Sequence, residues 1–204
     1  MGYKENKMRT KKLLFYLLAG ILGGCIPVMS VNPFYTESDI LFEESLLGTW
    51  IDDPNSPETT WEFSREDDPN TAYKLVFSDE EGRKGSFIAH LVKLQDVLFL
   101  DVFPAEMPWE TEDSNDLEFV YNSFFLIPAH TLLKVDSFEP QLILRLTVED
   151  DMKKLLEEHP GEIEYHSLGD RTILTSSTEE LQTFVLKYAD DERLFPGKVE
   201  LIRK

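Results

Sequence analysis

The chain has 204 residues, enough for one domain with a sizeable hydrophobic core and short for two. Its net charge of −19 argues against a nucleic-acid partner, because the basic residues cluster only within the first twelve positions. One cysteine excludes a disulfide framework and a CxxC-type zinc or redox site.

The first 25 residues have the pattern of an export signal. Five basic residues at positions 4–12 precede an apolar run at 13–21, which is shorter than the ~20 residues that span a bilayer. The run ends in Leu22-Gly23-Gly24-Cys25, which resembles the lipobox of bacterial lipoproteins. The resemblance implies cleavage before Cys25 and acylation of its thiol. The alternative is a buried membrane cysteine at the end of an N-terminal anchor.

This resemblance implies an organisation and a location. We expect a signal peptide over 1–24, a lipidated Cys25 and tether over 25–45, and one barrel-like domain over 46–204. Residues 26–36 contain two prolines and no charge, and we expect them to make no core contacts. The acyl chains, palmitate among them, would anchor the protein in the bacterial cell envelope. Ile26 after the cysteine resembles the outer-membrane sorting rule, if the host has two membranes.

From residue 46 onward, short alternating segments separated by turn residues predict an antiparallel sheet. Tyr73, Leu75 and Phe77, for example, share one face of a predicted strand, opposite Lys74 and Ser78. This alternation indicates one buried and one solvated face. The predicted strands cover residues 46–51, 60–65, 72–78, 85–94, 97–103, 129–136, 141–147, 172–176 and 199–203. The predicted fold class is mainly β with two or three helices, as an antiparallel barrel or a strongly curved sheet.

Two helices are predicted late in the chain. Thr147-Val148-Glu149-Asp150 and Ser177-Thr178-Glu179-Glu180 each have the form of a capping box. Apolar side chains follow each box at helical spacing. We expect both apolar stripes to pack against the sheet, and the alternative is a stripe that faces a ligand.

The loop lengths predict a cup with a mouth. Successive loops of an up-and-down barrel alternate between its two ends. The first, third, fifth and seventh connections are mostly longer than the second, fourth and sixth, so one end carries the large loops.

Leu47-Gly48-Thr49-Trp50 resembles the G-x-W motif of lipocalin-type barrels. The resemblance implies that Trp50 closes the barrel floor and that Gly48 allows close strand approach. It also implies a lipocalin-like order, with a late helix before a final strand. The chain differs from that family by a helix between its seventh and eighth predicted strands. Residues 46–204 also resemble small uncharacterised bacterial lipoproteins, which implies no activity.

Six residues are candidates for contacting a ligand in the barrel: Trp61, Phe63, Tyr73, Phe77, His90 and Trp109. His90 or His130 could orient a polar ligand head, or both could be structural histidines. The long segment 104–122 holds Met107 and Trp109 among acidic residues, and could cover the mouth or present an anchor to a partner. Its alternative is a solvated acidic loop with one tryptophan tucked onto the barrel.

The sequence contains no pattern that favours catalysis. It has no G-x-S-x-G elbow and no glycine-rich phosphate loop, and its cysteine belongs to the lipobox. Asp52-Asp53-Pro54-Asn55 and Asp67-Asp68-Pro69-Asn70 could supply oxygens to calcium, but the pattern favours ordinary turns. We therefore expect no enzyme, no metal and no cofactor.

Two functions follow as hypotheses. The first is a membrane-anchored lipoprotein that binds a small apolar or amphipathic ligand in the barrel cavity. The alternative is a non-enzymatic envelope scaffold with a filled core, which docks a basic protein partner through its acidic loop and Trp109.

Overall fold

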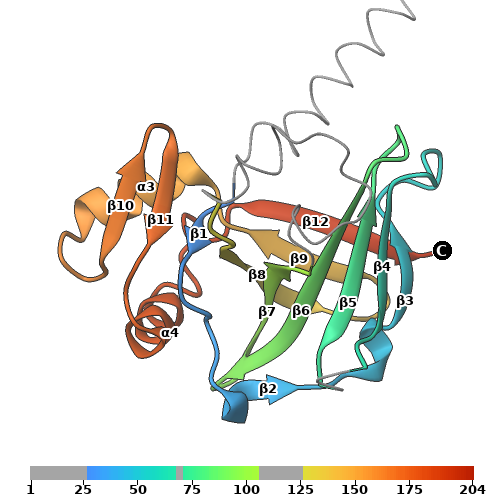
Figure 1. The fold of residues 1–204 in the computed structure, drawn as a ribbon, viewed down its shortest axis with the longest axis horizontal. Coiled ribbons are helices and arrows are strands. Elements are labelled where there is room, and N and C mark those ends of the chain that lie inside the picture. The colour runs from blue at the N-terminus through green and yellow to red at the C-terminus, as the bar shows by residue number, and fades with distance from the viewer. Residues whose placement is uncertain (1–26, 68–70, 106–125) are drawn as a thin grey trace, which may run out of the picture.

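Figure 1 shows the computed structural model, which describes residues 27–67, 71–105 and 126–204. The described chain is mainly β, with two α-helices and two short 3-10 helices among its strands. No helix of these residues is long and apolar enough to cross a membrane.

Eight strands form a closed antiparallel barrel. Consecutive strands pair from β3 to β9, and β12 closes the ring between β9 and β3. The barrel strands are β3 (Gly48–Ile51), β4 (Thr60–Arg65), β5 (Tyr73–Ser78), β6 (Lys84–Leu94), β7 (Val97–Pro104), β8 (His130–Ser137), β9 (Leu142–Leu146) and β12 (Gly197–Arg203). The predicted fold class is therefore confirmed.

Alternation along the strands sends one set of side chains into the barrel. We call this set the inner core. Its buried members are Leu46, Trp50, Phe63, Tyr73, Leu75, Ala89, Leu91, Leu100, Val102, Leu133, Val135, Leu142, Leu144 and Leu201.

The segment between β9 and β12 lies beside the barrel (Figure 1). It comprises α3 (Glu149–Glu158), β10 (Tyr165–Leu168), β11 (Arg171–Leu174) and α4 (Thr178–Lys187). The apolar faces of both helices pack with outward side chains of the barrel, which confirms the expected packing against the sheet. We call this second cluster the outer core; it includes Val28, Phe34, Val92, Phe99, Leu132, Met152, Leu155, Leu156, Leu181, Phe184, Val185 and Phe195.

The two helix starts differ from each other. The predicted capping box at α4 is confirmed, since the Ser177 hydroxyl accepts from the Glu180 amide and the Glu180 carboxylate accepts from the Ser177 amide. The predicted box at Thr147 is wrong. Val148 is the N-cap of α3 and makes no side-chain cap bond. The Thr147 hydroxyl accepts instead from the Val28 amide, 3.1 Å away, so it holds the N-terminal segment rather than the helix.

The predicted strand 172–176 corresponds to β11 but lies outside the barrel ring. It pairs antiparallel with β10 and parallel with β1 (Met29–Ser30). The eighth barrel strand is β12, because it alone pairs with both open edges, β9 on one side and β3 on the other.

The N-terminal segment packs into the fold instead of forming a free tether. After β1, it continues through η1 (Glu37–Asp39), β2 (Ile40–Leu41) and η2 (Glu44–Leu46). β1 lies between β8 and β11, and β2 pairs with β6. Val28 and Phe34 are 2% and 3% exposed. The expectation that this stretch makes no core contacts is therefore wrong for residues 27–36, because its apolar side chains complete the outer core.

The barrel has two unlike ends. Neighbouring strands of the barrel are all antiparallel, so successive connections alternate between its two ends. We call the end that carries connections 52–59, 79–83, 105–129 and 147–196 the open end, and the other the closed end. At the closed end, η2 brings the fully buried Leu46 into the inner core, and the Trp50 indole N–H donates to the Leu46 carbonyl at 2.9 Å. The expected distribution of long and short loops is confirmed.

Candidate ligand cavity

A cavity of about 230 Å³ lies within the open end of the barrel. The inward positions near the open ends of β4 to β9 form most of its wall. It is lined by Pro27, Trp61, Leu75, Phe77, Phe87, Val102, Thr131, Leu132, Leu133, Leu146 and Thr147. The barrel is thus hollow towards its large loops.

Aromatic side chains form one side of the cavity. Trp61 and Phe77 are cross-strand partners, and their rings meet edge to face with centroids 5.5 Å apart. Phe87 lies close over Gly85, where an added Cβ would come within 2.8 Å of the ring. Gly85 therefore leaves the space in which the Phe87 ring lies at the wall.

Both threonine hydroxyls of the wall hold the backbone of Val28. The Thr131 hydroxyl donates to the Val28 carbonyl, and the Thr147 hydroxyl accepts from the Val28 amide, both at 3.1 Å. The other described lining side chains carry no polar atom except the indole N–H of Trp61. Since a buried polar group without a partner is costly, this wall favours an apolar ligand.

The barrel interior is packed on the closed-end side of the cavity. Tyr73 is fully buried there, and its ring stacks on Phe42 at 4.7 Å and meets Phe63 edge to face. Its hydroxyl donates to the Glu43 carbonyl at 3.1 Å, and burial raises the pKa of this phenol. The cavity therefore ends on a solid floor.

The structure places the six predicted ligand residues in different surroundings. Trp61 and Phe77 line the cavity, whereas Phe63 and Tyr73 belong to the packed floor. His90 contacts Tyr35 on the outside of the barrel. Trp109 and the lipobox Cys25 lie outside the described residues.

Further cavity residues follow the pattern that sequence reasoning already used. Leu75, Phe87, Val102, Leu133 and Leu146 occupy inward positions of predicted strands, so the alternation could have identified them. Pro27 is different. It lies before the first barrel strand, and no periodicity points to it.

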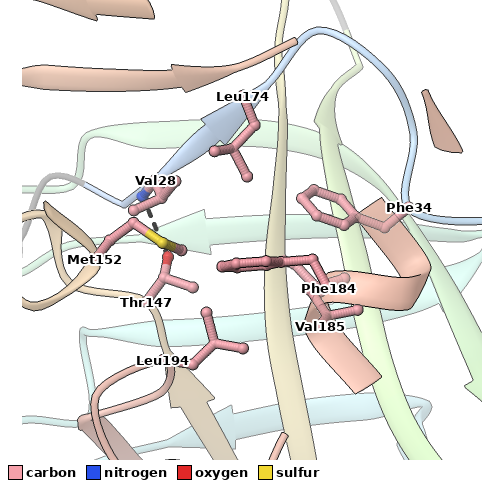
Figure 2. A pocket seen from close by; sticks show the side chains of 9 residues that line it. Val28, Phe34, Thr147, Met152, Leu174, Phe184, Val185 and Leu194 are labelled. Carbon is pink, nitrogen blue, oxygen red and sulfur yellow. Dashed lines mark hydrogen bonds between the residues drawn. The ribbon is translucent and has the colours of Figure 1, made fainter. Parts of the chain in front are cut away.

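A second hollow lies in the outer core and is essentially filled. Its volume is about 10 Å³, at the lower limit for one water molecule. Figure 2 shows the Phe34, Phe184 and Met152 side chains converging on it, together with the bond from Val28 to Thr147. This hollow has no room for a ligand.

A polar cluster lies on the outer wall of the barrel. Asp101 is fully buried; its carboxylate accepts from the Phe34 amide at 2.9 Å and contacts the His130 Nδ1 at 2.7 Å. His90 is 7% exposed, its ring lies 4.5 Å from that of Tyr35, and its Nδ1 has no hydrogen-bond partner. Burial lowers the pKa of His90, nearby Asp101 opposes that shift, and His130 adds to it.

This cluster fastens the N-terminal segment to the barrel. Asp101 joins a backbone amide of that segment to a side chain of β8, and Tyr35 covers His90. We assign the cluster a structural role, in keeping with the expectation that both histidines could be structural.

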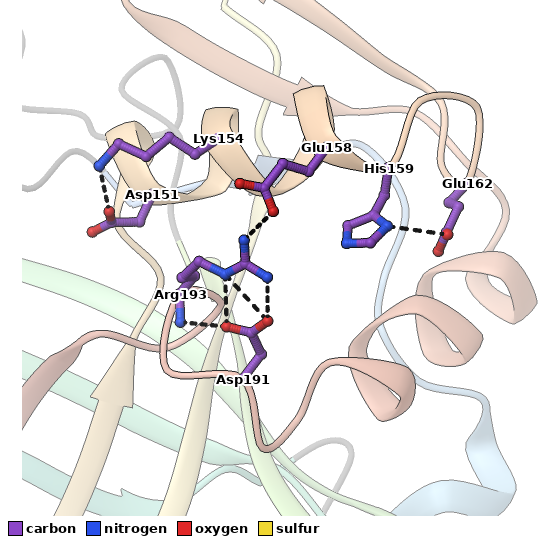
Figure 3. Close-up of polar contacts among 7 residues, drawn as sticks. All are labelled: Asp151, Lys154, Glu158, His159, Glu162, Asp191 and Arg193. Atoms are coloured by element: carbon purple, nitrogen blue, oxygen red, sulfur yellow. Dashed lines mark hydrogen bonds and ion pairs between the residues drawn. The ribbon is translucent and has the colours of Figure 1, made fainter.

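A charged network connects α3 to the turn before β12 (Figure 3). Arg193 contacts Glu158 at the end of α3 and Asp191 within its own turn, the latter at 2.7 Å. Hydrogen bonds from the Arg193 side chain and amide lower the pKa of Asp191 to about 2. His159 and Glu162 lie nearby, 3.6 Å apart. The network links the end of α3 to the turn before the closing strand.

The first acidic repeat forms a turn. Asp53 accepts from the Asn55 amide at 2.8 Å and from its side-chain nitrogen at 2.9 Å. The second repeat lies partly outside the described residues. Within residues 27–67, 71–105 and 126–204, no three His, Cys, Asp or Glu side chains are arranged to hold a metal ion.

Comparison with protein-family models, with curated proteins and with solved structures finds no match for this chain.

Proposed function

We propose that this chain is a lipid-anchored bacterial envelope protein that binds a small apolar molecule, without catalysis, in the open end of its barrel. The observation that carries the proposal is the 230 Å³ cavity, whose described wall is almost wholly apolar. Such a cavity suits an apolar guest, because transfer of apolar surface from water is favourable.

The cavity volume limits the guest. Apolar cavities of about 150 Å³ bind benzene, and drug-sized ligands occupy about 300–1,000 Å³. At 230 Å³, the space fits one short chain or one ring rather than a bulky ligand. A larger amphipathic ligand would keep its polar part outside the mouth.

The lipid anchor rests on the lipobox. Leu22-Gly23-Gly24-Cys25 supports acylation of Cys25, and the basic and apolar stretches before it support export. Palmitate labelling of the full chain tests this part, with Cys25→Ser as the unlabelled control. A mature N-terminus elsewhere, or an unmodified Cys25 by mass spectrometry, would overturn it.

Native mass spectrometry of the full chain, released from detergent micelles, tests ligand binding. A series of fatty acids from C6 to C16 serves as the probe. We expect retention by the wild type and at least tenfold weaker retention by Val102→Phe, which places a ring in the cavity. Val76→Phe is the matched control, since Val76 faces outward between the cavity residues Leu75 and Phe77. Equal retention by all three proteins would contradict the cavity as the binding site.

The scaffold alternative makes a different prediction. A basic partner that docks on acidic residues should dissociate at high salt, because screening acts over ~8–10 Å near physiological salt. Apolar binding in the cavity should change little with salt.

A further inference from the structure

The N-terminal segment leaves the folded domain at the wall of the cavity. Pro27 itself lines the cavity, beside Leu146 and Thr147. The next residue, Val28, is 2% exposed, and its amide and carbonyl are held by the hydroxyls of Thr147 and Thr131. β1 then continues along the open-end part of β8 (Figure 1). The exit point is therefore fixed by side-chain packing and by two hydrogen bonds.

Cys25 precedes Pro27 by only two residues. Consecutive Cα atoms are 3.8 Å apart, so the Cys25 Cα lies within about 8 Å of that of Pro27. An acyl anchor on Cys25 thus enters the membrane next to the cavity. A tether of twenty residues would have left the barrel free to turn, but two residues do not.

From this geometry we propose that the barrel stands with its open end on the membrane, and that its cavity takes one acyl chain of a lipid whose headgroup carries no net charge. This inference rests on the proposed lipid anchor and apolar cavity. The end of one acyl chain fits the 230 Å³ cavity, while the rest of that chain, the glycerol and the headgroup stay at the mouth. The Thr131 and Thr147 hydroxyls each hold the Val28 backbone, and apart from the Trp61 indole the other described lining side chains carry no polar atom for a headgroup.

The charge of the open end selects the headgroup. The described loops 52–59 and 79–83 carry six carboxylates and one arginine, and the Lys204 ammonium donates to the Pro57 carbonyl of the first loop at 2.9 Å. That arginine, Arg83, already pairs with Asp79 at 2.6 Å and with Glu81 at 3.0 Å. An anionic headgroup at this rim would face like charges at close range, whereas a zwitterionic headgroup would not.

The orientation can be measured on the full lipidated chain in phosphatidylcholine vesicles. Glu80→Cys places a fluorescent label at the open end, and Asp96→Cys places the same label in the closed-end hairpin; both native residues are exposed acids in turns. Nitroxide-labelled lipids should quench the label at 80 at least twofold more than the label at 96. Equal quenching, or stronger quenching at 96, would overturn the orientation.

A linker variant provides the matched control. Twenty glycine and serine residues inserted between Ile26 and Pro27 give a mean reach of about 25 Å, so the quenching ratio should fall towards one. A ratio that stays unchanged would show that the short connection does not orient the barrel.

The source of the acyl chain is identified by crosslinking. Vesicle phosphatidylcholine with a photoreactive acyl chain should crosslink to peptides of β4–β6, and to fewer of them in Val102→Phe. The same probe as phosphatidylglycerol should crosslink at least threefold less. If photoreactive palmitate incorporated at Cys25 labels these strands instead, the cavity holds the protein's own anchor and the bilayer-lipid proposal is wrong. Retention of fatty acids and palmitoylation of Cys25 are read separately, so the proposed function can stand when this inference fails.

Discussion

Arg203, near the end of the chain, lies over the indole of Trp50 in the first barrel strand. Its guanidinium is 4.4 Å from the ring centroid, and it donates to the Leu47 and Ser45 carbonyls at 2.7 Å each. One side chain thus joins the closing strand to η2 and to the tryptophan at the closed end. The guanidinium combines a cation–π contact with charge-assisted hydrogen bonds.

Gly48 is coupled to this contact. It has a φ of +122°, and an added Cβ would come within 2.7 Å of an Arg203 guanidinium nitrogen. We expect Gly48→Ala to be destabilising in the wild type and less so in Arg203→Ala, because the second background removes the clash but keeps the backbone strain. Urea unfolding of the double-mutant cycle should give a coupling of about 0.5–3 kcal/mol. Additive free energies of unfolding would contradict the contact.

Enlarging a side chain should have opposite effects at the two depths of the barrel. Val102 borders the cavity, whereas Ala89 is fully buried in the packed inner core. Val102→Phe should be neutral or stabilising, because the added ring fills empty space. Ala89→Leu should cost about 1–3 kcal/mol through overpacking. Thermal unfolding of both variants measures this difference, and equal destabilisation would argue against a hollow open end.

Removing the charge of Asp101 should loosen the N-terminal segment. Asp101→Asn weakens the bonds to the Phe34 amide and to His130, and we expect a loss of about 1–3 kcal/mol. Hydrogen exchange at the Phe34 amide should accelerate more than exchange in the barrel strands. Asp136→Asn is the control, since its pair with Arg145 is partly exposed and should contribute less than about 1 kcal/mol. Unchanged exchange at Phe34 would contradict the fastening role.

Stability should fall on mild acidification because of His90. Burial lowers its pKa in the folded state, so below about pH 6.5 the unfolded chain binds the proton more readily. Its contribution is fully present above the unfolded pKa and is lost as pH falls from there towards the folded pKa. Tyr35, Asp101 and His130 are the titratable groups that face it.

His90→Phe should remove this part of the pH dependence. The ring keeps its place beside Tyr35 and removes the unpartnered Nδ1, so stability at pH 7 should be equal or higher. Chemical denaturation at half-unit steps from pH 7.5 to 5 gives the slope. The carboxylates with lowered pKa values, such as Asp39 and Asp191, lose their contribution at lower pH and so do not interfere. An identical slope in the variant would rule out His90 as the source.

The alternation of single residues predicted the barrel strands well. Tyr73, Leu75 and Phe77 all face the interior, as a period of two predicts without knowledge of the partner strand. The same period does not show how far each side chain lies from the open end of the barrel. Tyr73 is therefore in the floor and Phe77 in the cavity wall, since depth depends on where each strand begins relative to its neighbours.

The local sequence pattern predicts neither which strand closes the barrel nor how the N-terminal segment packs against it. Predicted strands 172–176 and 199–203 looked alike, and only long-range pairing decided that β12 closes the barrel. β1 and β2 are two residues each, too short for any period. The place of β1 depends on the Val28 backbone meeting Thr131 and Thr147, residues more than a hundred positions away, and that of β2 on its pairing with β6.

The closure by β12 also sets the order of folding. Its pairing with β3 brings together Ile202 and Ile51, so the barrel cannot form until nearly all of the chain is available. Such sequence-distant pairing gives a high contact order, which is associated with slow folding. A chain that emerges from its N-terminus, whether from a ribosome or through a membrane pore, therefore exposes the unpaired edges of β3 and β9 until β12 arrives. That interval is when this protein is most open to aggregation and to chaperones.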